Sequence, residues 1–244
     1  MKLAGHVLPY LRGEKFSNGL EIDYNYYQTI PDRINLLKTL STGKKIIHLG
    51  CLDHMPLIDA KVKEGKWLHQ QLTDVAQQCI GVDINRDTQQ YVNEKYNINN
   101  IVIADITGEP IPEITAEKWD YAILGELLEH IDNPVHFLGQ IKKNYGQYVD
   151  RLIITVPNAF TVNNFKQATK SKEIINTDHR FWFTPYTLAK VVWHAGMETE
   201  EILFANRIPL STGGLIKKKI YSLMNKPLKH NFTMASSIVS IARL

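Results

Sequence analysis

The sequence has little of several features that would place it in a specialised class of protein. Its 244 residues include only two cysteines, Cys51 and Cys79, so we expect buried thiols rather than a disulfide framework. No apolar run reaches the length of a membrane span, and Met1–His6 lacks the apolar core of a signal peptide. These absences predict a cytoplasmic protein with no transmembrane segment.

The net charge is also small, and sequence repeats are absent. The formal net charge is only +3, which is too small to indicate nucleic-acid binding, so no nucleic acid is expected as a partner. The chain has no internal repeat and no low-complexity tract. Its composition, 44% hydrophobic and 22% charged, is that of an ordinary globular protein. We expect a single domain over residues 1–244. A homodimer is a further possibility that the sequence leaves open.

One stretch organises the rest of the chain. The apolar run Ile46-Ile47-His48-Leu49 predicts a buried strand, and Gly50 follows it. A glycine at this point allows a sharp turn or a close approach of the backbone to a ligand. In open α/β sheets, ligands bind at the carboxyl ends of the strands. Gly50 is therefore predicted to form the floor of a nucleotide-type pocket, the alternative being an ordinary turn.

Strands and helices are predicted to alternate after this stretch. Further strands are expected at 79–82, 101–104, 119–124, 151–156, 201–205 and 237–242, and helices at 31–40, 67–78, 87–96, 135–143 and from 185 to a stop at Gly196. Leu52–Pro56 is predicted as a loop. This alternation indicates an α/β fold with a mainly parallel sheet and right-handed crossovers. The last two strands lack a crossover helix between them, which favours an antiparallel pair at one edge.

Two flanking regions do not follow the alternation. Residues 1–28 are rich in tyrosine and are expected to form an N-terminal arm or a lid over the pocket. Tyr27 is a candidate for substrate contact. Residues 206–236 form a basic insertion that contains Lys217-Lys218-Lys219. Such a run is typical of a solvated face, and contact with a phosphate or an anionic lipid surface is the alternative. Residues 29–205 would be the cofactor-binding core, and residues 237–244 the last strand.

Acidic residues close several of the predicted strands. Asp83 follows the second strand, where an acid commonly accepts from the hydroxyls of a ribose, and Asp105 follows the third. The alternative role for Asp83 is that of a helix N-cap. The distance from Gly50 to Asp83 exceeds the roughly 20 residues of a dinucleotide fingerprint, and its glycine pattern is absent. A nicotinamide-dependent reductase is therefore disfavoured.

Taken together, the strand ends resemble those of class I S-adenosylmethionine-dependent methyltransferases, over residues 30–205 and more weakly in the last strand. The matching pieces are Ile46–Cys51, Gly81–Ile84, Ala104-Asp105, Trp119–His130, Val156–Asn158, Asp178–Thr184 and Ala195–Met197. The chain is most similar to bacterial enzymes that act on sugars of surface glycans or on small metabolites. The resemblance implies a three-layer Rossmann-like sandwich, with a seven-stranded, mostly parallel sheet and one antiparallel edge strand.

The resemblance also implies S-adenosyl-L-methionine as cofactor and assigns residues to it. Asp83 would hold the ribose with Ile84 against the adenine, Asp105 and Ile106 would lie at the adenine amino group, and the methionine end would lie against Gly50, Cys51, Gly125 and Glu126. The first loop departs from the family pattern. His48 replaces the usual acid, and Leu52 and His54 replace two glycines, which leaves room for a pseudoenzyme.

Methyl transfer to a hydroxyl needs a base, and histidine titrates nearest neutrality. His130 is the first candidate because it follows strand four, and His179 is the second; the alternative for each is to pack or anchor its loop. His54 and Trp182 are candidates for substrate contact, with core packing as the alternative for Trp182. His69, within a helix, is expected to be structural. Their spacing matches no metal-ligand pattern, so no metal is expected.

The sequence therefore predicts an S-adenosylmethionine-dependent methyltransferase with a small-molecule or glycan acceptor. The expected reaction is O-methylation of a sugar or small-metabolite hydroxyl. Methylation of a nitrogen or carboxylate of a small metabolite is the competing reaction. A cofactor-binding pseudoenzyme that serves as a partner subunit is the non-enzymatic alternative.

Overall fold

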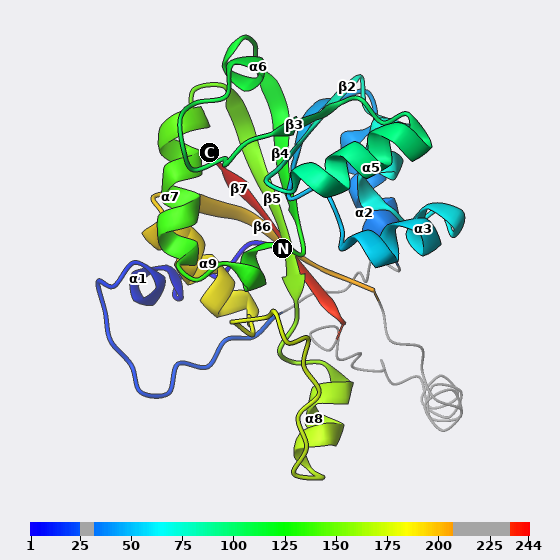
Figure 1. The fold of residues 1–244 in the computed structure, drawn as a ribbon. Helices are drawn as coiled ribbons and strands as arrows, with labels where there is room; N and C mark the ends of the chain where they lie inside the picture. Colours follow the sequence, from blue (N-terminus) through cyan, green and yellow to red (C-terminus); the bar gives the residue numbers. More distant parts are fainter. Residues whose placement is uncertain (25–31, 207–234) are drawn as a thin grey trace, which may run out of the picture.

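A twisted sheet lies between two layers of helices in the computed structural model, which describes residues 1–24, 32–206 and 235–244 (Figure 1). Tyr27 and Lys217-Lys218-Lys219 lie outside the described residues. The strands are β1 Lys45–Leu49, β2 Gln78–Asp83, β3 Ile101–Ile103, β4 Trp119–Gly125, β5 Val149–Pro157, β6 Glu198–Ala205 and β7 Ser237–Arg243. Each predicted strand is present, and the ends differ by no more than a few residues.

The sheet has the order β3-β2-β1-β4-β5-β7-β6. The strands from β3 to β5 run parallel, whereas β7 runs antiparallel to both of its neighbours. This arrangement confirms the seven-stranded, mostly parallel sheet and the late antiparallel pair. The antiparallel strand itself is β7, and it lies between β5 and the edge strand β6.

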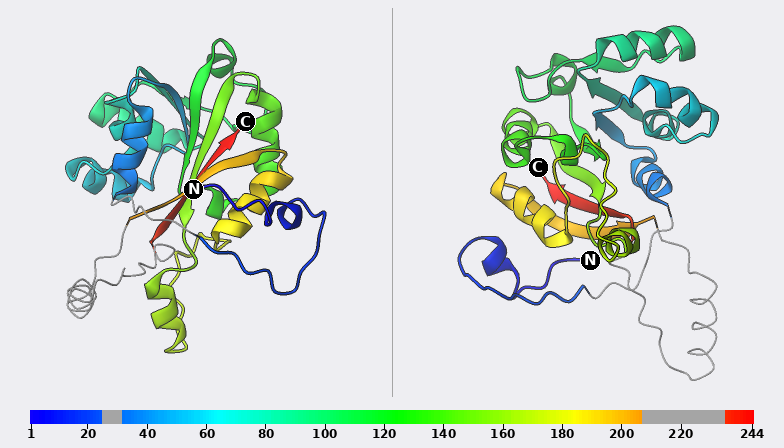
Figure 2. Two further views of the ribbon diagram at one scale, coloured as in Figure 1. Left: turned by 180° about the vertical axis from the view of Figure 1, so that it is seen from behind. Right: turned by 60° about the horizontal axis from the view of Figure 1, so that its bottom comes forward.

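Successive residues of the central strands face opposite layers of the sandwich, as the two-residue period of a strand requires. Ile46, Ile123 and Ile153 pack with α2 (Arg33–Ser41) and α4 (Leu68–Thr73). The alternate residues pack in the main core, which includes α7 (Pro134–Tyr145) and α9 (Pro185–His194). The views in Figures 1 and 2 agree that α7 and α9 cover one face and α2 the other.

The remaining helices are short or lie at the margins of the sheet. They are α1 Leu8–Leu11, α3 Met55–Lys63, α5 Arg86–Tyr96, α6 Pro112–Thr115, the 3-10 helix η1 Leu128–His130 and α8 Val162–Ala168. In the part of the chain that the structure describes, no helix is both long enough and apolar enough to cross a bilayer. Both cysteines are buried and unpaired, as predicted.

Helix α3 begins inside the stretch that the sequence predicts as a loop. Pro56 occupies its first turn, a position that tolerates the missing N–H. Only Ile58 of this helix is buried, so the stretch carries no apolar period. The opposite error occurs in α4, which ends at Thr73 rather than at 78. The chain leaves that helix because the Gln77 N–H must reach the Lys44 carbonyl, 2.9 Å away, where β2 starts beside β1.

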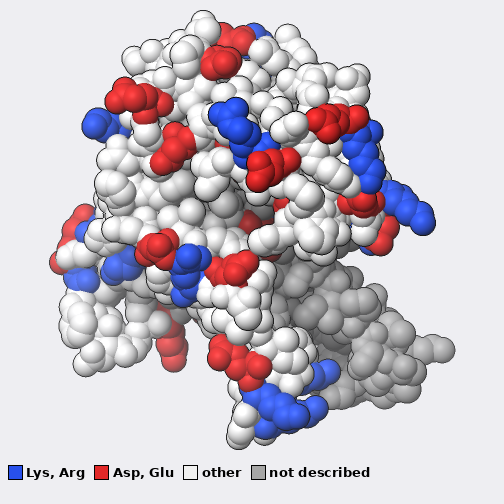
Figure 3. Space-filling view, in the orientation of Figure 1, with Lys and Arg blue, Asp and Glu red and all other residues white. Residues whose placement is uncertain are grey.

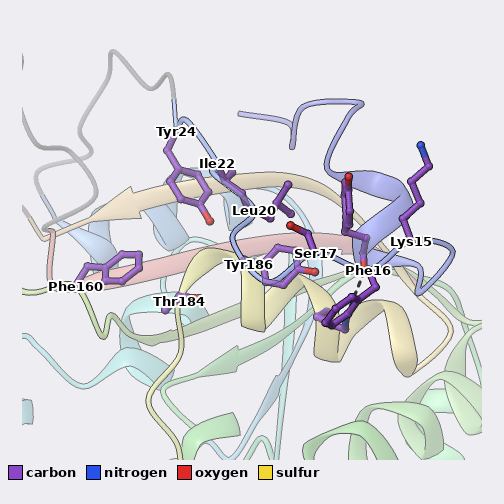
Figure 4. A pocket seen from close by; sticks show the side chains of 11 residues that line it. Lys15, Phe16, Ser17, Leu20, Ile22, Tyr24, Phe160, Thr184 and Tyr186 are labelled. Atoms are coloured by element: carbon purple, nitrogen blue, oxygen red, sulfur yellow. Dashed lines mark hydrogen bonds between the residues drawn. The ribbon is translucent and has the colours of Figure 1, made fainter.

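The N-terminal arm packs on β6 and α9. Met1 and Ile202 exchange backbone hydrogen bonds of 2.7 and 2.8 Å, and Lys190 donates to the Tyr10 carbonyl at 3.2 Å. A cavity of about 700 Å³ lies where the arm meets α9, and Tyr24 of the arm and Tyr186 of α9 both line it (Figure 4). Residues 1–24 thus pack on the domain, and the choice between an arm and a lid for residues 1–28 stays a prediction.

Candidate active site

The carboxyl ends of β1, β2, β3 and β4 surround a cavity of about 800 Å³, here named the large cavity. All the predicted cofactor residues except Cys51 line it: Gly50, Asp83, Ile84, Asp105, Ile106, Gly125 and Glu126. Cys51 lines a neighbouring cavity instead, and its side chain, only 2% exposed, packs in a cluster with Ile58 and Trp67. No described residue of the N-terminal arm contributes to this cavity.

Gly50 turns the chain out of β1 in a conformation that favours glycine. Its φ angle is +64°, and its N–H donates to the Val82 carbonyl at 2.9 Å. A Cβ added at Gly50 would lie 2.8 Å from Cδ2 of Leu127, closer than real contacts allow. The missing side chain therefore allows Leu127 to pack directly against the turn at the wall of the cavity, and the contact of Gly50 with the cofactor stays a prediction.

Asp83 organises the loop that departs from the family pattern. Its two carboxylate oxygens accept from the backbone N–H groups of Leu52, at 2.9 Å, and of Asn85, at 3.0 Å. The N-cap of α5 is Asn85, whose side chain accepts from the Thr88 N–H, so the N-cap alternative for Asp83 is wrong. Each carboxylate oxygen has more than one lone-pair site, so Asp83 retains capacity for a ligand hydroxyl.

The next two predicted residues suit a ring system with an amino group. Ile84 lines the large cavity and is 75% exposed, which is unusual for a large apolar side chain. Asp105 also lines it, and Oδ1 of Asp105 accepts from the N–H and the hydroxyl of Thr107 at 2.8 and 2.7 Å. These bonds fix the orientation of a carboxylate that lies at the end of β3.

Glu126 holds a strained position just beyond β4. It is a non-glycine residue with φ of +59°, and its N–H donates to the Thr155 carbonyl at 3.0 Å. Its carboxylate accepts from the Ser237 hydroxyl at 3.3 Å and lies 3.7 Å from Nε of Arg33. Strain of this kind concentrates at functional sites. The sequence gives no signal for Arg33, because no pattern at the start of a helix reveals that a side chain contacts strands far away in the sequence.

A smaller cavity of about 400 Å³ adjoins the large one, and we name it the small cavity. The two cavities share the walls formed by Gly50, Gly125, Glu126 and His130. Glu129, His179 and His48 line only the small cavity. Figure 3 shows a hollow in the middle of this face with acidic atoms inside it, and mixed charges around it.

Two of the three candidate histidines meet at the small cavity. The rings of His130 and His179 lie 4.7 Å apart, nearly perpendicular, and burial lowers the pKa of each below its usual value. The Arg180 N–H donates to the Glu129 carbonyl at 2.8 Å, which places His179 beside η1. His54 lies at the exposed rim of both cavities, with Nε2 3.4 Å from Oδ2 of Asp178.

Trp182 lines a third cavity of about 580 Å³, which Arg33 and Glu126 also line, and its ring lies edge-on to that of His179 at 6.3 Å between centroids. His69 is buried, stacks on His48 at 5.6 Å between ring centroids, and pairs with Oδ1 of Asn100 at 3.2 Å. Burial lowers the pKa of His69 to about 4. The geometry of His69 is that of a structural residue.

Glu129 is the residue that sequence reasoning missed. It is fully buried, and neither oxygen of its carboxylate has a hydrogen-bond partner among the described residues. Burial, followed by the charge of Glu126, raises the pKa of Glu129 to about 8. The signal in the sequence is its position directly before His130 at the end of a strand, but the flanking Leu127-Leu128 makes the segment look like core.

Comparison with protein families shows which family this cavity at the strand ends belongs to. A family model described as a methyltransferase domain matches residues 22–202. The chain belongs to this methyltransferase family. It is an S-adenosylmethionine-dependent enzyme with the class I fold, and S-adenosyl-L-methionine is its cofactor. A comparison with curated protein sequences finds no match.

Solved structures of methyltransferases share the fold at low sequence identity. Magnesium protoporphyrin IX methyltransferase of Synechocystis PCC 6803, with bound S-adenosylhomocysteine, has TM-score 0.51 and 13% identity over 86% of this chain and 81% of that one. A methyltransferase-fold protein from Bacillus halodurans has a TM-score of 0.50 and 14% sequence identity, and the match covers 86% of this chain and 98% of that one. The small RNA methyltransferase HEN1 has a TM-score of 0.52 and 16% sequence identity. The match covers 94% of this chain but only 27% of the HEN1 chain.

Proposed function

We propose that this methyltransferase acts on a hydroxyl group of a sugar or small metabolite. The cofactor would lie in the large cavity, with its ribose at Asp83 and its methionine end at Glu126. The acceptor would enter the small cavity, with His54 at its rim. The observation that carries the proposal is the position of His130, which lines both cavities at the wall where they meet.

The reaction is an in-line displacement at the methyl carbon. The hydroxyl oxygen forms a bond to that carbon, the carbon–sulfur bond breaks, and sulfur keeps the electron pair in the neutral product S-adenosylhomocysteine. The cofactor supplies the reactivity, whereas the protein positions the acceptor and helps to remove its proton. His130 and His179 support this assignment because their lowered pKa values keep both rings neutral near pH 7.

A nitrogen or a carboxylate acceptor would not need such activation. The names of the similar structures include a porphyrin and an RNA methyltransferase, so the acceptor panel should contain small hydroxyl compounds, glycans, amines, carboxylates and short RNA. We also propose that the enzyme works in the cytoplasm, since both of its cysteines are unpaired thiols.

The test measures methyl transfer from S-adenosylmethionine across this panel. We expect a hydroxyl acceptor to be methylated, and His130→Gln to lower kcat by about 100-fold or more, the usual range for a proton-transfer group. His136→Gln, an exposed histidine on α7 that lines neither cavity, is the matched control. An amine or carboxylate product whose formation survives His130→Gln would instead support the competing reaction.

A further inference from the structure

Three potential ligands for a metal ion lie together on the wall of the small cavity. Glu129, His130 and His179 each offer one ligand atom, and these atoms lie within 4.8 Å of one another. Among the described residues, no other group of three histidine, cysteine or acidic side chains is as close. Glu129 and His130 come from η1, whereas His179 comes from a loop nearly 50 residues later.

The carboxyl group of this cluster has no hydrogen-bond partner in the part of the chain that the structure describes. Glu129 is completely buried, and neither of its oxygens accepts a hydrogen bond from residues 1–24, 32–206 or 235–244. Its nearest polar neighbour in the cluster is Nε2 of His179 at 3.9 Å, which is too long for a hydrogen bond. A buried carboxylate without a partner is costly, so an ordinary ion pair does not account for this arrangement.

The backbone holds the three side chains in place. The Arg180 N–H donates to the Glu129 carbonyl at 2.8 Å, and the His130 N–H donates to the Leu127 carbonyl at 3.0 Å. The ring of His130 also lies close to the backbone of Asp178. Histidine ligands commonly donate their second ring N–H to a backbone carbonyl, which leaves the other nitrogen for the metal.

We propose that Glu129, His130 and His179 bind one divalent first-row transition-metal ion, to which the acceptor hydroxyl coordinates. Two imidazoles and one carboxylate form a donor set suited to zinc, cobalt or iron rather than to calcium or magnesium, which prefer oxygen. Ligand distances of about 2.1 Å require donor atoms roughly 3 to 3.5 Å apart. The donor atoms of Glu129 and His179 lie 3.9 Å apart and all three lie within 4.8 Å of one another, so the side chains must approach by roughly 1 Å when the ion binds.

This inference rests on the proposed function only for its acceptor part. A hydroxyl bound to such an ion has a lowered pKa and releases its proton to water, after which the oxygen attacks the methyl carbon as described above. His130 and His179 then activate the acceptor as ligands instead of removing its proton directly. The site replaces the expectation, drawn from sequence spacing, that no metal is bound.

The test uses the full chain, stripped with a chelator and saturated with S-adenosylhomocysteine. Binding of Co²⁺ is followed by its visible absorption, which reports histidine ligation, and binding of Zn²⁺ by calorimetry. We expect one ion per chain, and an at least tenfold weaker affinity in Glu129→Gln and in His179→Gln. Asp132→Asn, which removes an exposed carboxylate two residues from His130, should keep the affinity of the wild type.

Loss of the Co²⁺ bands in both cluster variants, with S-adenosylhomocysteine affinity unchanged, would support the site. Absence of Co²⁺ and Zn²⁺ binding by wild-type protein that binds S-adenosylhomocysteine would overturn it and leave the proposed function standing. Ion binding that survives in Glu129→Gln and His179→Gln would also overturn it, because the ion would then lie elsewhere. An intact metal site with no hydroxyl product would instead overturn the acceptor part alone.

Discussion

The two cavities differ in how their acidic residues are satisfied. In the large cavity, Asp83 and Asp105 accept hydrogen bonds from the backbone of their own loops, and both carboxylates reach solvent. In the small cavity, Glu129 is buried, and its carboxyl group receives no hydrogen bond from the residues that the structure describes. The large cavity is therefore organised before any ligand arrives. The small cavity holds an unsatisfied carboxyl group, whose burial raises its pKa to about 8, and a ligand would relieve the cost of that burial; this contrast is open to direct tests.

The largest expected effect is on cofactor binding in the large cavity. Asp83→Ala should weaken binding of S-adenosylmethionine by about 100-fold, because charge-assisted hydrogen bonds contribute roughly 1.5 to 3 kcal/mol each. The substitution also releases the Leu52 N–H, so the loop after β1 loses its anchor. Calorimetric titration with S-adenosylmethionine and S-adenosylhomocysteine measures both affinities.

Two further variants separate these contributions. Asp83→Asn keeps an acceptor near the loop but removes the charge, and it should bind with intermediate affinity. Asp150→Ala, an exposed acid at the start of β5, should bind like the wild type. Equal affinities for Asp83→Ala and the wild type would show that the cofactor does not use this carboxylate.

Histidine pairs give a second contrast, and it depends on pH. The pair His48–His69 lies in the core, and burial lowers the pKa of His69 from 6.5 to about 4. Burial, together with the nearby His69 and the charge of Arg33, also lowers the pKa of His48. The unfolded state then binds protons that the folded state does not, so stability falls as pH drops from about 6.5 towards 4.

For His69 alone, the loss between pH 7 and pH 5 should be about 2 kcal/mol. Urea unfolding at the two pH values measures it. His69→Gln retains an amide for Asn100 but cannot titrate, so its stability should fall by about 2 kcal/mol less than that of the wild type. His6→Gln, at an exposed position, is the control. A pH dependence identical in His69→Gln and wild type would contradict the burial argument.

Replacement of the unsatisfied carboxylate should stabilise the metal-free protein. Glu129→Met puts a side chain of similar length into the same buried space and removes a carboxyl group that is largely protonated at pH 7 and has no hydrogen-bond partner among the described residues. This change should raise the free energy of unfolding by about 1 to 2 kcal/mol. The same variant should lose methyl transfer. Chemical denaturation at pH 7 with a chelator present gives the first quantity, and turnover gives the second. A destabilised Glu129→Met would mean that the protein itself satisfies the carboxylate.

The large cavity was predictable from the sequence, whereas most of the small one was not. Gly50, Asp83 and Asp105 each close a strand, and a parallel sheet brings its strand ends together, so local patterns suffice. The position of His179 beside Glu129 depends instead on one backbone hydrogen bond between segments about 50 residues apart. No periodicity records such a contact. Helix α3 was missed for a related reason, since it buries a single residue.

The smallest expected effects come from a pair of glycines, one on the wall shared by both cavities and one far from it. Gly50→Ala places a Cβ on a residue with φ of +64° and 2.8 Å from Leu127, so it should cost about 1 to 2 kcal/mol of stability. The same methyl group would displace the Leu127 side chain on the wall of the large cavity, and cofactor affinity should fall as well. Denaturation and calorimetry on one preparation measure both changes.

Gly139→Ala is the matched change. Gly139 lies inside α7 with nothing within 4 Å of an added Cβ, so alanine should stabilise the helix by about 0.5 to 1 kcal/mol and leave cofactor affinity unchanged. Opposite signs for the same added methyl group would show that Gly50 is required by the geometry of the strand end. If Gly50→Ala were as stable as Gly139→Ala and bound the cofactor normally, the turn after β1 would be adjustable, and the shared wall would not restrict the cofactor.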